Sequence, residues 1–137
     1  MKRKLNEKQL LKLAEEIRDK QYNGEPFAEE MKEFQKNVLY PNVEELFFND
    51  QNEKYIVKRA LSYKNIKPGD LSRDELINLV KRIQNNEADE EYKADQLIQI
   101  VSDAVVDPYI TDYIFFEDEL TAEQIVDKAL SYKPIIL

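Results

Sequence analysis

A nine-residue segment occurs twice in this 137-residue chain. Residues 56–64 read IVKRALSYK and residues 125–133 read IVDKALSYK, so seven of the nine positions are identical. Self-similarity of this kind indicates a repeated structural unit, which constrains the fold more than any single residue does. We therefore predict a tandem duplication with two copies, residues 1–68 and residues 69–137.

Two further pairs of segments keep the same order and spacing. Residues 10–17 correspond to 76–83, and residues 41–50 correspond to 108–118. The separation between corresponding positions is nearly constant along the chain, so small loop insertions account for the drift. Chance similarity between amphipathic helices does not produce three matches in register. The copies are predicted to divide at the KPGD segment, residues 67–70.

Both copies have the apolar periodicity of α-helices. Apolar residues repeat at helical spacing in Leu10, Ala14 and Ile17, and again in Leu76, Val80 and Ile83. Asn6 with Gln9, and Ser72 with Glu75, have the spacing of an N-cap residue and its partner. The predicted helices cover residues 10–17, 27–38, 43–48 and 52–63 in the first copy, and 76–83, 97–105, 110–116 and 121–132 in the second. The predicted fold class is all-α, with four helices in each copy.

The third helix of each copy is short and carries two adjacent phenylalanines, at 47–48 and 115–116. Pro41 and Pro108 precede it and are predicted to end the second helix, because proline lacks an amide N–H and disfavours helical geometry in the residue before it. Adjacent residues lie about 100° apart around a helix and cannot both point directly into one core. We predict that one phenylalanine of each pair packs inward and the other faces outward.

Composition excludes several classes of active site. The chain has no His and no Cys, so it contains no Ser-His-Asp triad, no Cys-His dyad, no disulfide and no zinc site of the usual kind. Only two glycines are present, which argues against glycine-rich phosphate loops. The sequence therefore favours a binding protein over an enzyme and predicts neither a cofactor nor a metal.

Charge is distributed unequally between the copies. The net charge is −8, but residues 1–68 have a balance of +2 and residues 69–137 have a balance of −10. An acidic chain is a poor general binder of nucleic acid, whereas a strongly negative copy attracts a basic protein surface. No apolar run approaches the ~20 residues of a spanning helix, and the basic start lacks the apolar stretch of a signal peptide. We expect a cytoplasmic protein that does not associate with membranes.

Residues 107–116 read DPYITDYIFF. This segment resembles the His-Pro-x-Gly-Ser-Asp-Leu-Ile-Tyr-Tyr segment of the colicin E-type and pyocin immunity proteins, with the proline, aspartate, isoleucine and paired aromatic positions at the same spacing. The resemblance covers residues 71–134 well and residues 5–64 less well. Both tyrosines of the family pair are phenylalanine here, so their hydroxyl hydrogen bonds cannot be carried over. The resemblance implies two four-helix, immunity-protein-like units packed together that inhibit a nuclease bacteriocin.

The same resemblance implies where the toxin binds. In the second copy the candidate residues are Asp112, Phe115 and Phe116 on the short helix, with Asp95, Ile98, Gln99 and Ser102 on the second helix, placed by counting back from Pro108. The secondary candidates, in the first copy, are Glu44, Phe47 and Phe48. The implied partner is the basic nuclease domain of a cognate bacteriocin, bound without cofactor, metal, nucleic acid or membrane.

Two other functions fit the same composition. An acidic all-α adaptor that organises host proteins would need no toxin partner, and a nucleic-acid mimic would inhibit a DNA-binding protein more generally. A neighbouring gene that encodes a nuclease-type toxin favours the immunity function, whereas a housekeeping neighbourhood favours the adaptor.

Overall fold

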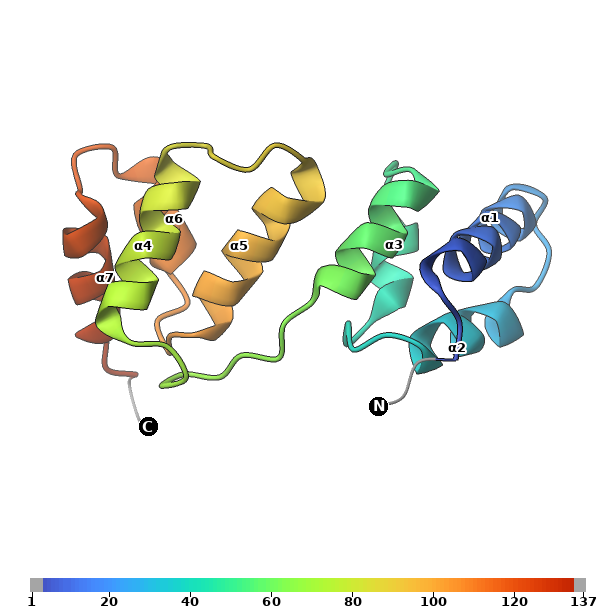
Figure 1. The fold of residues 1–137 in the computed structure, drawn as a ribbon, viewed down its shortest axis with the longest axis horizontal. Helices are drawn as coiled ribbons and strands as arrows, with labels where there is room; N and C mark the ends of the chain where they lie inside the picture. The colour runs from blue at the N-terminus through green and yellow to red at the C-terminus, as the bar shows by residue number, and fades with distance from the viewer. Residues whose placement is uncertain (1–3, 135–137) are drawn as a thin grey trace. The chain divides into compact units, whose positions relative to one another are not determined.

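The structure is a computed structural model that describes residues 4–134 (Figure 1). Every regular element in this range is a helix and no β-strand occurs within it, which confirms the predicted all-α class. Internal contacts divide the chain into a first unit that ends at Tyr63 and a second unit that begins at Lys64. This boundary lies before the predicted one at residue 68, because the backbone of Lys64 is hydrogen-bonded to the Gln99 side chain of the second unit.

The first unit contains α1 (Glu7–Tyr22), α2 (Ala28–Lys36), the 3-10 helix η1 (Val43–Phe47) and α3 (Glu53–Ser62). Helix α1 begins at the predicted cap, where the Asn6 side chain accepts from the Gln9 N–H at 2.8 Å and the Gln9 side chain accepts from the Asn6 N–H at 2.9 Å. The core consists of Leu10, Ala14, Ile17, Met31, Phe34, Val38, Val43, Leu46, Phe47, Ile56, Val57 and Ala60. At its centre the rings of Phe34 and Phe47 meet edge to face at 5.6 Å.

The second unit contains α4 (Arg73–Gln84), α5 (Glu91–Asp103), α6 (Ile110–Phe116) and α7 (Ala122–Leu130). The predicted capping box of Ser72 and Glu75 starts α4, and Thr121 with Gln124 forms another at the start of α7. The core consists of Leu76, Ile77, Val80, Val101, Ala104, Val105, Ile110, Ile114, Ala122, Ile125, Val126 and Ala129. This core contains no aromatic residue among its fully buried members, unlike that of the first unit.

Prolines do not end the second helix of either unit, so that prediction is wrong. Helix α2 ends at Lys36 and α5 ends at Asp103, each more than a helical turn before the proline. In the first unit the buried Asn37 causes the earlier end, because its side chain donates to the Glu33 carbonyl at 2.8 Å and accepts backbone N–H groups from Lys4 and Leu5. The chain therefore leaves the helix at Asn37, four residues before the proline.

The two short helices bury different positions. In η1 the buried residues are Val43, Leu46 and Phe47, whereas in α6 they are Ile110 and Ile114, at the i, i+4 spacing of an α-helix. The first phenylalanine of the pair is thus part of the core in the first unit, while the second unit buries the isoleucine that precedes its pair.

One arginine fastens the segment that follows η1. The guanidinium of Arg18 on α1 donates to the carbonyls of Phe47, Asn49 and Gln51 at 2.7, 2.9 and 2.7 Å, and its central carbon lies 5.6 Å from the centre of the Phe47 ring. When the two units are aligned on their first helices, the residue that corresponds to Arg18 is Gln84, which donates a single bond of 3.3 Å to a backbone carbonyl.

Candidate functional site

Helix α6 presents both of its phenylalanines to solvent. Phe116 is 80% exposed and Phe115 is 48% exposed, while Ile110 and Ile114 turn into the core. The prediction of one inward and one outward phenylalanine is therefore wrong in the second unit. The prediction is confirmed in the first unit, where Phe47 is buried and Phe48 is exposed. The isoleucines occupy the core-facing side of α6 and leave no inward position for an aromatic ring.

Phe115 lies against α5. It lines a small cavity of about 70 Å³ together with Ile98 and Leu97 of α5 and Ile83 of α4. The structure therefore brings together Phe115 and Ile98, two candidates that belong to different helices. Phe115 is thus partly covered by α4 and α5, whereas Phe116 is largely exposed.

Asp112 and Phe116 share one side of α6, because residues four apart are neighbours on a helix. Asp112 is exposed and has no ion-pair partner among the described residues. Glu117 follows the helix and is paired with Lys128 at 3.0 Å, but Asp118 and Glu119 have no such pairing within the described range. Within the described residues, the exposed Phe116 thus has one unpaired carboxylate a helical turn before it and two more shortly after it in the sequence.

The candidates on α5 occupy one side of that helix. Asp95, Ile98, Gln99 and Ser102 are spaced i, i+3, i+4 and i+7, and all four are partly exposed. Helices α5 and α6 pack against each other, so the two candidate sets belong to adjoining surfaces. The amide group of Gln99 makes hydrogen bonds within the second unit: it donates to the Lys64 carbonyl at 2.7 Å and to the Asp103 carboxylate at 2.8 Å.

A buried carboxylate that sequence reasoning missed holds α6 in place. Asp107 is 1% exposed and accepts hydrogen bonds of 2.8 Å from the Tyr109 N–H and from the Tyr113 hydroxyl. Burial, and then the bond to Asp107, raise the pKa of Tyr113 to about 12. The bond to Tyr109 has the geometry of an Asx turn, and an aspartate directly before a proline was the available signal for it.

Comparison with known proteins identifies the second unit. Residues 69–134 match the family described as colicin immunity protein / pyocin immunity protein. A protein of Bacillus subtilis (strain 168), described as "Uncharacterized protein YezA", is 41% identical over 64 residues, which are 46% of this chain and 93% of that protein. The chain belongs to the colicin/pyocin immunity protein family. No solved structure matches it.

The family match covers the part of the chain that contains the main candidate residues. The matched range contains α4 to α7 and therefore includes all seven candidates on α5 and α6. The Bacillus subtilis relative is covered almost entirely by a segment about as long as one unit. A single unit is thus the size of a whole protein elsewhere, and this immunity protein contains additional helices before the match.

The three secondary candidates lie in the first unit, where one is buried and two are exposed. Phe47 packs inside the core against Phe34, whereas Phe48 remains 69% exposed. Glu44 is exposed at the start of η1 and lines a groove beside α2. Of the three secondary candidates, Phe47 is therefore not available to a partner in this structure.

The described part of the chain contains neither a metal-ligand cluster nor a membrane-spanning helix. Within residues 4–134, no group of three or more Asp, Glu, His or Cys side chains is arranged to hold a metal ion. No helix in the same range combines the length and apolar composition needed to cross a membrane.

Replacing Tyr113 by phenylalanine tests the anchor of α6. We expect a loss of about 1–2 kcal/mol in the free energy of unfolding at neutral pH, since the variant removes a hydrogen bond to a buried carboxylate. The ordinary tyrosine pKa is near 10 and that of Tyr113 is about 12, so the neutral hydroxyl stabilises the fold below pH 10 and this contribution is lost as the pH rises toward 12. Urea unfolding followed by circular dichroism measures both effects. A difference between the two proteins that stayed constant from neutral pH to about pH 12 would contradict the assignment.

Proposed function

We propose that the second unit binds the basic nuclease domain of a cognate bacteriocin and inhibits it without covalent chemistry. The bound unit occludes the active site or the substrate-binding surface beside it. The observation that carries the proposal is the exposure of both Phe115 and Phe116 on α6, next to the exposed Asp112 and inside the family-matched range. Aromatic side chains that become buried at an interface are typical binding anchors.

Charge supports a basic partner. Residues 69–137 have a balance of −10, and the four cations of this unit that form ion pairs leave Asp112, Asp118 and Glu119 without one in the described range. Nucleases need positive surfaces to hold phosphates, so a negative unit is attracted to the part of the toxin that binds substrate. The inhibitor and the substrate then compete for the same region.

The mechanism requires no catalysis by the immunity protein. Without His or Cys, the chain lacks the residues of the common nucleophilic mechanisms, and tight binding alone explains protection. Inhibition of this kind protects a producing cell when the immunity protein meets the toxin in the cytoplasm. The partner is therefore a protein, and neither a cofactor nor a metal takes part.

Co-expression with a nuclease-type toxin from a neighbouring gene tests the proposal. Cells that express the nuclease domain should survive only when the immunity protein is present, and the two purified proteins should form a complex. If the proteins neither associate nor protect, while the immunity protein is folded, the chain functions instead as an adaptor with another partner. A complex that leaves nuclease activity unchanged would contradict inhibition.

Salt should act mainly on the association rate. Electrostatic steering by the balance of −10 in residues 69–137 accelerates encounter and is screened as ionic strength rises, so we expect association to slow about tenfold between about 0.02 and 0.5 M salt. Dissociation should change much less, because it depends on contacts already made. Stopped-flow mixing measures both rates. An association rate that does not respond to salt would remove the role assigned to the acidic unit.

A further inference from the structure

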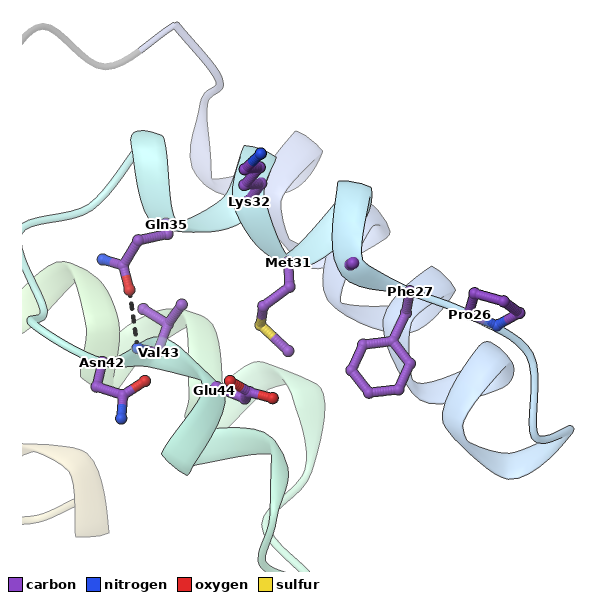
Figure 2. Close-up of a pocket in the computed structure, with 9 residues that line it drawn as sticks. Pro26, Phe27, Met31, Lys32, Gln35, Asn42, Val43 and Glu44 are labelled. Atoms are coloured by element: carbon purple, nitrogen blue, oxygen red, sulfur yellow. Dashed lines mark hydrogen bonds between the residues drawn. The ribbon is translucent and has the colours of Figure 1, made fainter.

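The first unit contains a groove between α2 and η1. It has a volume of about 500 Å³ and its apolar lining includes Phe27, Met31 and Val43. Figure 2 shows the side chains of Phe27 and Met31 pointing from α2 toward the segment that carries Glu44. The groove is thus open to solvent and has an apolar floor.

Hydrogen bonds give the groove a fixed shape. The Gln35 side chain accepts from the Val43 N–H at 3.1 Å and donates to the Tyr40 carbonyl at 2.6 Å, as the dashed line to Val43 in Figure 2 indicates in part. These two bonds tie the start of η1 to α2. The walls therefore keep their separation without a ligand, which lowers the ordering cost of binding.

The groove occupies the positions in the first unit that correspond to the candidate toxin-binding face of the second. When α2 is aligned with α5 and η1 with α6, Asp95, Ile98, Gln99, Ser102 and Asp112 correspond to Ala28, Met31, Lys32, Gln35 and Glu44. All five first-unit residues line the groove. The cavity follows from geometry and the repeat follows from sequence, so two independent observations select the same surface.

The chemistry of the two faces differs. Where the second unit has Asp95 and Gln99, the first has Ala28 and Lys32, so a negative charge is lost and a positive one is gained. Lys32 lies on α2 and Glu44 lies on η1, and neither has an ion-pair partner among the described residues. The groove therefore offers an apolar floor between one cation and one anion, with no excess of either sign.

We propose that this groove is a second docking site, which receives an apolar side chain from a protein partner whose contact surface is close to neutral. The partner places an acidic group near Lys32 and a basic group near Glu44. The proposal rests on the proposed function of the second unit, because it treats the groove as the first unit's version of that binding face. The partner of the groove differs from the partner of the second unit. A basic surface is attracted to the acidic second unit, but it gains no net electrostatic attraction at a groove with one cation and one anion.

The methionines of the chain provide a direct test. Met1 and Met31 are the two methionines in the sequence, so labelling the methionine methyl groups with carbon-13 places one reporter in the groove. The probe is a short peptide of zero net charge with a central phenylalanine, flanked by one aspartate and one lysine in otherwise Gly/Ser sequence. The Met31 signal should shift and saturate on titration with this peptide. A matched peptide with alanine in place of phenylalanine should leave it unchanged.

Charge reversal at the rim tests the specificity of the site. Lys32→Glu should weaken peptide binding about fivefold or more, because it replaces an attraction by a repulsion. Lys36→Glu is the matched control: Lys36 is an exposed lysine on the same helix that does not line the groove, and its reversal should leave binding unchanged. No response of Met31 to the phenylalanine peptide, or an equal loss in both variants, overturns the proposal.

The cognate nuclease domain separates this inference from the proposed function. Its binding to the second unit should leave the Met31 signal in place, so that peptide and nuclease bind together. A nuclease that displaced the peptide from Met31 would overturn the separate site. If instead the nuclease failed to bind while the peptide still shifted the Met31 signal, the proposed function of the second unit would be wrong, whereas the proposed docking site in the groove would be supported.

Discussion

Phe116→Ala is expected to weaken binding of the cognate nuclease domain by at least about 2 kcal/mol, which is roughly 30-fold in the dissociation constant. The side chain is 80% exposed and makes little contribution to the core, so its value lies in what it contacts in a partner. Surface substitutions of this kind usually change folding stability by no more than about 0.5 kcal/mol. Isothermal titration calorimetry measures the loss of affinity, and thermal unfolding of the free protein verifies that folding is unchanged.

Phe48→Ala is the matched control for this substitution. Phe48 is the second residue of the corresponding pair in the first unit and is 69% exposed. Its loss removes a similar apolar surface from the other unit and should leave nuclease affinity unchanged. Asp112→Asn should weaken binding in the same direction as Phe116→Ala, most strongly if the carboxylate meets a desolvated cation. If Phe48→Ala abolished protection while folded Phe116→Ala protein still protected, the assignment of the binding unit would be wrong.

Local rules predicted most of the fold. The capping boxes at Asn6 and Ser72 and the apolar stripe on each helix depend on residues within one or two turns, so the sequence alone specifies them. The repeat then indicated the order of the elements in both units. The proline signal failed because Asn37, which bonds to the distant residues Lys4 and Leu5, ends α2 before the proline can act.

The candidate site was predicted in part. Family spacing selected Asp112 and Phe116, which are exposed on one side of α6, but Phe115 is also exposed because Ile110 and Ile114 take the buried positions of that helix. Phe47 is buried in η1 whereas Phe115 is 48% exposed on α6, and this difference in packing is not evident before the structure is known. The Asp107–Tyr113 bond likewise depends on burial, which the sequence pattern does not report.

Arg18→Ala is expected to lower the free energy of unfolding of the first unit by about 2–4 kcal/mol. The guanidinium donates three hydrogen bonds to backbone carbonyls and lies over the Phe47 ring, so its removal leaves the Asn49 and Gln51 carbonyls without this donor, leaves the Phe47 carbonyl with the 3.3 Å bond from Gln21, and loosens the segment between η1 and α3. Arg18→Lys should recover only a fraction of the loss, because an ammonium group cannot span carbonyls of three residues with a planar fork. Urea unfolding measures the magnitude.

Hydrogen exchange followed by mass spectrometry locates the effect of Arg18→Ala. Faster exchange is expected in η1 and α3, while α4 to α7 keep their protection, since the bonds of Arg18 remain inside the first unit. The control is Gln84→Ala, which removes the single bond at the corresponding position of the second unit and should cost about 1 kcal/mol or less. If both substitutions destabilised the protein equally, Arg18 would not be the residue that fastens the short helix. If Arg18→Ala also increased exchange in α6, the two units would unfold together. A substitution in the groove would then weaken nuclease binding simply by destabilising the second unit.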